Sequence, residues 1–174
     1  MDLPALAARR IRDIPDYPQP GVMFKDITPL LADRTAFSGV VDAMVAFRGA
    51  HTVDVVVGVE ARGFILAAPV AYHMGAGFVP VRKGGKLPAA TLHEDYALEY
   101  GTGVMELHAD ALEPGARVLV VDDVLATGGT AAAAVSLVRQ TGADVVGVAV
   151  LIEIAALGGR SALPGLDVHA LLTY

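Results

Sequence analysis

The run from Val118 to Thr130 constrains the fold of this chain more than any other stretch. Four apolar residues, ending at Val121, precede the acid pair Asp122 and Asp123, a small glycine-rich turn and an alanine-rich segment. The apolar run predicts a strand buried on both faces, as in a parallel sheet. Glycines in the turn permit positive φ and end the strand, and the alanine-rich segment predicts a helix. The order strand, acids, turn, helix therefore predicts a βα unit.

The glycine-rich turn has the chemistry of an anion site. Its successive N–H groups can converge on one point, and Thr127 and Thr130 add hydroxyl donors. Thr130 can also cap the helix, whose N-terminus favours an anion. We therefore expect a phosphate at this turn, which comprises Ala126, Thr127, Gly128, Gly129 and Thr130.

The acid pair beside this turn needs a separate explanation, because two carboxylates repel a phosphate and no basic residue lies between Asp122 and Thr130. The conflict disappears if the acids bind another part of the same ligand, such as the two hydroxyls of a ribose. They would also stabilise positive charge on a sugar ring whose glycosidic bond breaks. The competing interpretation is a plain βα turn with a solvated acidic edge. The chain has neither a Walker loop nor a G-x-G-x-x-G fingerprint.

Length and composition exclude several classes of protein. We expect one domain, residues 1–174, and 54% hydrophobic residues argue against disorder. The sequence contains no stretch of eighteen uncharged apolar residues, so we expect no membrane span. The charged N-terminus is unlike a secretory signal. The absence of cysteine fits a cytoplasmic protein, and the net charge of −6 argues against a nucleic-acid partner. The five histidines have no spacing typical of a metal site.

Periodicity and turn residues predict alternating helices and strands around a parallel α/β sheet, with ligands at the carboxyl ends of its strands. Pro15–Pro29 is expected to be irregular, and Lys83–Tyr100 to be a long connection with extended pieces. The expected helices are Leu3–Ile11, Arg34–Arg48, Phe64–Met74 and Ala131–Gln140. The expected strands are Val53–Val59, Phe78–Val81, Val104–His108, Val118–Val121, Val145–Ile152 and Val168–Leu172.

Two further segments carry positive charge to the same edge of the sheet. Glu60–Gly63 follows a strand, and its Arg62 can bind a diphosphate or a planar base, although an ion pair is the simpler role. Arg82–Pro88 holds three cations on a glycine-hinged loop, which can close over a diphosphate or remain a solvated basic turn.

Two remaining segments each allow a functional and a structural interpretation. Pro20–Leu31 is bracketed by prolines, and its Met23 and Phe24 can cover a flat aromatic ring or simply belong to the core. Glu99, flanked by tyrosines, would be shielded from water if its loop closes, which suits proton transfer. Position alone does not distinguish Glu99 from Glu94, Asp95 or Glu106.

Taken together, these segments resemble the type I phosphoribosyltransferases, from about Ile11 to the end of the chain. Val118–Thr130 matches the signature for the phosphoribosyl diphosphate donor, and Glu60–Gly63, Arg82–Pro88 and Pro20–Leu31 match the adenine-specific members. Gly84 stands where those members commonly have proline, which leaves the hinge looser. The resemblance implies an α/β fold whose central, mostly parallel sheet is flanked by helices. It also implies an N-terminal arm and purine hood (1–33) and a flexible lid loop (82–101).

The resemblance also implies transfer of the phosphoribosyl group to adenine, giving AMP and diphosphate in purine salvage, by a homodimer. Magnesium would be carried on the donor's oxygens rather than in a protein cage. The implied catalytic residues are Asp122, Asp123 and Glu99. The implied diphosphate contacts are Glu60, Ala61, Arg62, Gly63, Arg82, Lys83 and Lys86. The implied adenine contacts are Met23, Phe24, Lys25, Arg62 and Leu125.

Two alternatives stay open. The same fold and donor could serve another base, such as hypoxanthine, guanine, xanthine or orotate, although the N-terminal hood argues against this. The other alternative is a non-catalytic regulator that senses the donor and binds nucleic acid, but the chain has neither a DNA-binding module nor a basic face.

Overall fold

The computed structural model describes residues 2–49, 51–97 and 102–174, and these form two compact units, Met1–Ala43 and Met44–Tyr174. The first unit contains α1 (Leu3–Arg9), the hairpin of β1 (Arg12–Pro15) and β2 (Met23–Asp26), and α2 (Thr28–Ala32). Helix α3 (Arg34–Arg48), which has the predicted bounds, begins in this unit and ends in the second. Asp2 caps α1 by accepting the Ala5 N–H at 3.1 Å.

The hairpin corrects the expectation that Pro15–Pro29 is irregular. β1 and β2 are antiparallel, and oppositely charged residues face each other across them, Arg12 opposite Asp26 and Asp13 opposite Lys25. Both pairs are ion pairs, at 2.8 and 2.7 Å. Such cross-strand pairs stabilise a ladder. Prolines hid this strand signal, although Pro15 is tolerated because it ends its strand.

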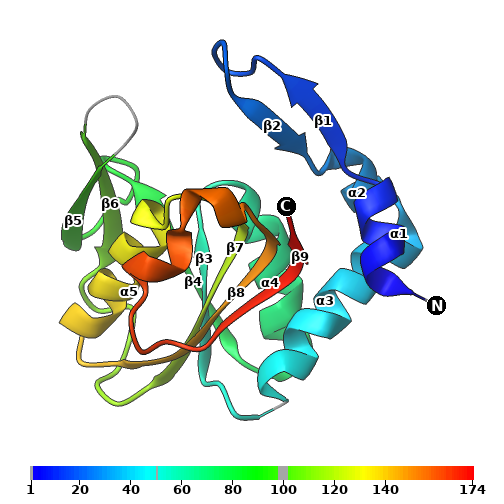
Figure 1. The fold of residues 1–174 in the computed structure, drawn as a ribbon. Coiled ribbons are helices and arrows are strands. Elements are labelled where there is room, and N and C mark those ends of the chain that lie inside the picture. The colour runs from blue at the N-terminus through cyan, green and yellow to red at the C-terminus, as the bar shows by residue number, and fades with distance from the viewer. Residues whose placement is uncertain (1, 50, 98–101) are drawn as a thin grey trace. The chain divides into compact units, whose positions relative to one another are not determined.

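The second unit is built on a seven-stranded sheet in the order β5-β6-β4-β3-β7-β8-β9 (Figure 1). β4, β3, β7, β8 and β9 are parallel, whereas β6 is antiparallel to both β4 and β5, which confirms the mostly parallel α/β sheet. The strands are β3 (Val55–Val59), β4 (Gly77–Lys83), β5 (Thr91–Ala97), β6 (Thr102–His108), β7 (Arg117–Leu125), β8 (Asp144–Glu153) and β9 (Val168–Thr173). The helices are α4 (Arg62–Met74) and α5 (Gly129–Gln140), with the short turns η1 (Ala155–Leu157) and η2 (Gly159–Ala162).

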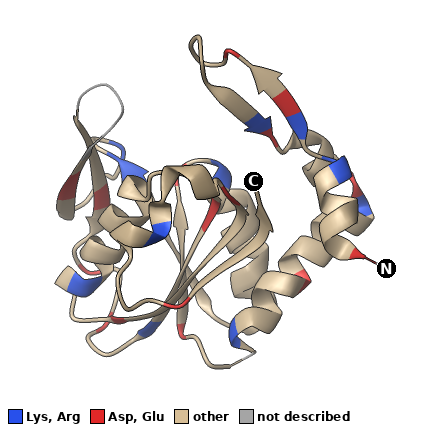
Figure 2. Ribbon diagram, in the orientation of Figure 1, with Lys and Arg blue, Asp and Glu red and all other residues tan. Residues whose placement is uncertain are grey.

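Helices α4 and α5 cover opposite faces of the sheet. Val57 and Val120 pack in one cluster with residues of α5. Gly58, which points the other way, lies against α4, because a Cβ on it would approach the Ala67 Cβ to 2.8 Å. In Figure 2 the middle of the central strands is mostly free of charged residues, as expected for strands buried on both faces.

The predicted strands all have somewhat different bounds in the structure, and the largest difference is in β7. β7 does not end at Val121 but continues through both acids to Leu125, because β8 pairs with it as far as Leu125 opposite Glu153. The extended structure expected within Lys83–Tyr100 is present as β5, which pairs with β6 from Thr91 to Ala97. β5 is also joined to α5, since Glu94 accepts hydrogen bonds from Ser136 Oγ and Gln140 Nε2, both at 2.8 Å. Among the described residues, no helix is long and apolar enough to cross a membrane.

Asp54 and Arg117 form a bidentate ion pair at the N-terminal ends of β3 and β7. This pair determines how the stability of the fold should respond to acid. Arg117 donates from Nη2 and Nε to the two Asp54 oxygens at 2.7 and 3.0 Å. These bonds lower the pKa of Asp54 from 3.8 to about 2. A depressed carboxyl pKa contributes stability that is present above the unfolded value and is lost as the pH falls through the folded value.

We therefore expect Asp54→Asn to lower the urea midpoint of unfolding at neutral pH and to have little effect near pH 2. Urea titrations of both proteins across this range measure the difference. Equal destabilisation at both ends of the range would contradict the role of the pair.

Candidate active site

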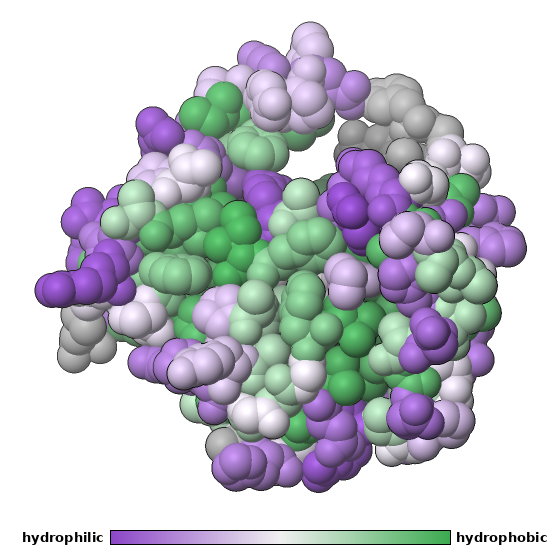
Figure 3. Space-filling view, turned by 180° about the vertical axis from the view of Figure 1, so that it is seen from behind, coloured by the Kyte–Doolittle hydropathy of each residue, from purple (hydrophilic) through white to green (hydrophobic). Residues whose placement is uncertain are grey.

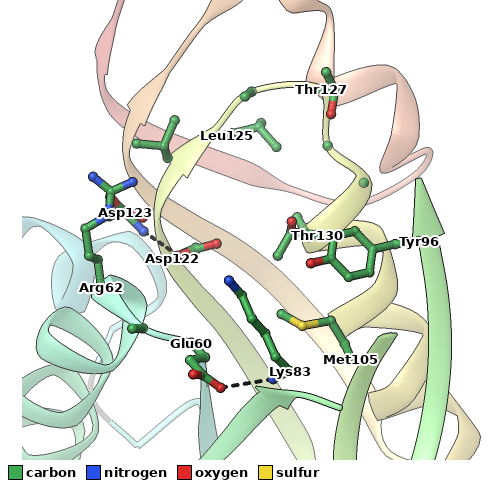
Figure 4. A pocket seen from close by; sticks show the side chains of 16 residues that line it. Glu60, Arg62, Lys83, Tyr96, Met105, Asp122, Asp123, Leu125, Thr127 and Thr130 are labelled. Carbon is green, nitrogen blue, oxygen red and sulfur yellow. Dashed lines mark hydrogen bonds and ion pairs between the residues drawn. The ribbon is translucent and has the colours of Figure 1, made fainter. Parts of the chain in front are cut away.

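A cavity of about 450 Å³ opens at the carboxyl ends of β3, β4 and β7 (Figure 4). This is the edge at which ligands bind in parallel α/β sheets. Its wall combines acidic, basic and glycine-rich elements that come from three different strand ends. The lining residues are Glu60, Ala61, Arg62, Lys83, Tyr96, Met105, Asp122, Asp123, Val124, Leu125, Ala126, Thr127, Gly128, Gly129, Thr130 and Ala131.

The acid pair is buried at the end of β7, where Asp122 is 8% and Asp123 5% exposed. Asp122 Oδ1 accepts the backbone N–H of Asp123 at 2.8 Å. Burial, reinforced by the charge of Asp123, raises the pKa of Asp122 well above its usual value. Burial also raises the pKa of Asp123, and the attraction of Arg62 only partly opposes this shift. Both carboxyls therefore carry a cost of burial, which hydrogen bonds donated by the hydroxyls of a ligand can offset.

Arg62, the first residue of α4, lies beside this pair with its Nε 2.9 Å from Asp123 Oδ2. The contact is an ion pair without the alignment of a hydrogen bond, and Asp123 Oδ2 is a buried acceptor with no hydrogen-bond donor among the described residues. The expected turn Glu60–Gly63 is thus directly in contact with the acids. Its Glu60–Ala61 peptide bond is cis.

Glu60 is the counter-ion of the basic loop. Its buried carboxylate pairs with Lys86 Nζ and with Arg82 Nε at 3.3 Å, and accepts the Lys83 N–H at 3.0 Å. Burial alone would raise the pKa of Glu60, but Lys86, the Lys83 amide and Arg82 together lower it below the usual value. The carboxylate is therefore ionised and is shared between Lys86 and Arg82, whereas the Lys83 ammonium points into the cavity (Figure 4).

The glycine-rich turn joins β7 to α5 at the cavity wall. Gly128, not Thr130, is the N-cap of α5, with φ of 87°, and Thr130 lies within the first turn of the helix. The expected capping role of Thr130 is therefore wrong, because the left-handed Gly128 starts the helix earlier. The first helical bond runs from the Ala132 N–H to Gly128 O at 2.8 Å, so the N–H groups before it are available to an anion.

The other predicted site residues lie in different places. Met23, Phe24 and Lys25 are on β2 in the first unit, where the Phe24 ring meets Tyr17 edge-on at 5.1 Å. Leu125 is buried and lines the cavity. Arg82 and Lys86 are paired with Glu60 and are not among the residues that line the cavity. Glu99 lies outside the described residues.

Sequence reasoning missed Tyr96, which enters the cavity from β5. Gly103 on β6 is opposite it in register, and a Cβ on Gly103 would lie 2.6 Å from the Tyr96 ring. Burial, helped by the charge of Glu60, raises the pKa of Tyr96, so its hydroxyl remains a donor at neutral pH. Residues Thr91–Ala97 show no regular alternation of apolar and polar residues, so the sequence held no clear signal for this strand or for its pairing partner.

The site does not provide a cage for a metal ion. Within residues 2–49, 51–97 and 102–174, no three His, Asp or Glu side chains gather closely enough to hold one. The oxygens of Asp122 and Asp123 suit Mg²⁺ chemically, but two buried carboxylates fill only part of its octahedral shell. A magnesium ion at this cavity would therefore need ligands from a substrate and from water.

Comparisons with known proteins agree with this geometry. The family model described as a phosphoribosyl transferase domain matches residues 34–162. The adenine phosphoribosyltransferase of Acidothermus cellulolyticus is 65% identical over 171 residues, 98% of this chain and 97% of that protein.

Two crystal structures have the same fold. The adenine phosphoribosyltransferase of Thermoanaerobacter pseudethanolicus has a TM-score of 0.95 at 46% identity, over 98% of this chain and 99% of that one. The enzyme of Saccharomyces cerevisiae, solved with an imino-altritol bisphosphate and adenine, has a TM-score of 0.92 at 35% identity, over 98% of both chains.

Gly63 is the point at which α4 can approach the acid pair. A Cβ there would lie 2.8 Å from Asp122 Oδ1 and 3.0 Å from the Val121 carbonyl oxygen. We expect Gly63→Ala to lower the free energy of unfolding by about 1–3 kcal/mol, because the helix or the carboxylate must move. Gly77→Ala is the control, since its Cβ would meet Val55 at an ordinary 3.6 Å. Urea unfolding measures both variants, and similar losses would contradict the packing argument.

Proposed function

Because the chain belongs to the phosphoribosyl transferase family, we infer that it is an enzyme whose cavity binds a phosphoribosyl donor. It transfers the phosphoribosyl group of 5-phospho-α-D-ribose 1-diphosphate to adenine and releases AMP and diphosphate, a purine salvage reaction. One observation in the site carries the donor chemistry: a buried acid pair lies directly before a helix N-terminus, with one carboxylate oxygen still lacking a hydrogen-bond donor.

The two halves of this site fit the two halves of a ribose phosphate. The turn Ala126–Thr130 offers backbone N–H groups and two hydroxyls to the 5′-phosphate. Asp122 and Asp123 accept hydrogen bonds from the ribose hydroxyls, and Asp123 Oδ2 is the buried oxygen that still lacks a donor. The acids face the sugar rather than the phosphate, so the like-charge repulsion expected from the sequence does not arise.

The diphosphate is assigned to the cations at the ends of β3 and β4. Lys83 points into the cavity, and Arg62 is paired with Asp123. When ribose hydroxyls take over Asp123, Arg62 can turn to the diphosphate or the purine. Arg82 and Lys86 form ion pairs with Glu60 at the edge of the loop, from which they can turn to the diphosphate. Mg²⁺ carried on the donor, when bound, would neutralise part of the charge that develops on the diphosphate.

Bond breaking at the sugar leaves positive charge on the ring and negative charge on the departing diphosphate. The acid pair lies on the ribose side and the cations on the diphosphate side, so both charges are stabilised where they develop. The remaining acceleration comes from holding the two substrates in position and excluding water.

The purine side rests on the family resemblance. Met23, Phe24 and Lys25 of β2, together with Arg62 and Leu125, are proposed to contact adenine, and Glu99 to move the proton of the purine. A cytoplasmic location is consistent with a chain that contains no cysteine.

The experiment that tests this function combines the protein, magnesium and the phosphoribosyl donor with adenine, hypoxanthine or guanine in separate reactions. AMP should form rapidly, and the other two bases should react poorly. Removing magnesium with a chelator should abolish turnover, and adding it back should restore it. Preferential turnover of hypoxanthine or guanine would overturn the assignment of adenine.

The ribose role of the acid pair predicts the effect of one isosteric change. Asp123→Asn should reduce kcat/KM by about 100-fold, because a charge aimed at the developing positive ring is lost. The fold should be retained, since the amide has the same shape and removes a buried charge. Steady-state kinetics and thermal unfolding measure these effects. Asp110→Asn, at an exposed turn, is the control, and an unchanged rate for Asp123→Asn would exclude the role.

A homodimer is proposed through the outer face of α4 and β4. Ile65 and Tyr72 lie one heptad apart on α4 and are 44% and 82% exposed, and Phe78 of β4 is 38% exposed. Apolar residues also gather near the middle of the face shown in Figure 3. Exposed apolar surface of this kind is typical of interfaces. Light scattering should give twice the 18.0 kDa mass of the chain, and Tyr72→Asp should lower it. A monomer at all concentrations would contradict the proposal.

A further inference from the structure

The turn η2 packs against the back of the glycine-rich turn, backbone to backbone. A Cβ on Gly159 would collide with the Ala126 carbonyl oxygen and lie 3.0 Å from Leu125 Cγ. Reciprocally, a Cβ on Gly128 would collide with the Gly159 carbonyl oxygen and lie 2.8 Å from the Ala162 Cβ. Each glycine therefore occupies the space that a side chain on the other turn would need.

The turn η2 is itself held in place by Arg160. The guanidinium binds Glu153 through two parallel hydrogen bonds, Nε to Oε1 and Nη2 to Oε2, both at 2.8 Å. Its Nη1 donates to the Val168 carbonyl oxygen at 2.8 Å. Glu153 is 7% exposed, ends β8, and is opposite Leu125 in the parallel ladder. Arg160 thus joins the turn to β8 and β9 with a geometry that a point charge cannot reproduce.

From this packing we propose that Gly159 and the Glu153–Arg160 pair are positioning residues for the 5′-phosphate of the substrate. They act by fixing the backbone of Ala126–Gly128, and the proposal rests on the phosphate role proposed above for Ala126–Thr130. A phosphate bound by converging N–H groups requires donor–acceptor distances near 2.9 Å, so a small shift of the turn weakens several hydrogen bonds together. Binding of substrates that carry this phosphate therefore depends on Gly159 and the Glu153–Arg160 pair, whereas binding of adenine does not.

The chain provides a matched control at the opposite edge of the sheet. Arg117 also forms a bidentate pair, with Asp54, and also donates to a carbonyl oxygen, that of His51 at 3.3 Å. The two arginine side chains are similarly exposed, 47% for Arg117 and 50% for Arg160. Arg117 begins β7, however, and the cavity lies at the other end of that strand. A purely structural role for Arg160 predicts that both variants behave alike.

The experiment compares Arg160→Met with Arg117→Met in the full-length protein. For Arg160→Met we expect the KM for the phosphoribosyl donor and the calorimetric Kd for AMP to rise about tenfold, with the KM for adenine changed less than about twofold. Arg160→Lys should be intermediate, since it retains one hydrogen bond to Glu153. Arg117→Met should leave all three constants near those of the parent. Thermal unfolding of each variant establishes that folded protein is compared.

Two further variants separate the proposal from the assignment on which it rests. Thr130→Ala removes a hydroxyl from the phosphate turn itself. If it raises the donor KM and Arg160→Met does not, the phosphate role stands and the positioning role is overturned. If neither variant raises it, both fail. Glu153→Gln should resemble Arg160→Met, and the double variant should be no worse than Arg160→Met alone, because both act through one interaction. Additive losses would overturn the paired role.

Discussion

The burial of two adjacent carboxylates at the end of β7 is the constraint on which the rest of the site depends. Burying a charge is costly unless it is paired, and the partners of Asp122 and Asp123 include the Asp123 N–H and Arg62. Gly63 is necessary because a side chain there would strike Asp122. Arg62 follows from the same approach, since the first residue of α4 is the one that reaches Asp123. The local structure thus buries two acidic groups with few partners, and hydrogen bonds from a hydroxylated ligand offset the cost of this burial.

In the basic loop, the cost to be offset is repulsion between positive charges. Three cations that gathered without counter-charge would repel one another in the absence of a diphosphate, and Glu60 prevents this by pairing with Lys86 and Arg82. Of these three cations, only Lys83 directs its ammonium into the cavity. The acid-rich half has two carboxyls beside Arg62, and the base-rich half has three cations beside Glu60, so a donor that carries both hydroxyls and a diphosphate complements both halves.

Local sequence was sufficient for the elements in which function and fold coincide. The β7–turn–α5 unit, the parallel strands, Arg62 and Lys83 all follow from residues adjacent in the chain. The features that escaped depend on pairing between distant segments: the register that sets Tyr96 opposite Gly103, the continuation of β7 along β8, and the packing of Gly159 behind Gly128. The residues around Gly159 in the sequence give no indication that it packs against the glycine-rich turn. The hairpin of β1 and β2 was concealed by its prolines, although its alternating charges were a usable signal.

The order of the strands sets a length scale for anything that enters the cavity. β3 lies between β4 and β7, so the strand end that carries Lys83 and the strand end that leads to the glycine-rich turn are two strand spacings apart. With neighbouring strands about 4.8 Å apart, the proposed diphosphate and 5′-phosphate sites are offset by roughly 10 Å across the sheet, and the turn lies further along the strands than Lys83. The spacing of the strands therefore sets a minimum distance between these two parts of the cavity. An inhibitor that engages both proposed sites must therefore hold its anionic groups at least this far apart, and one with a single anion can engage only one of them.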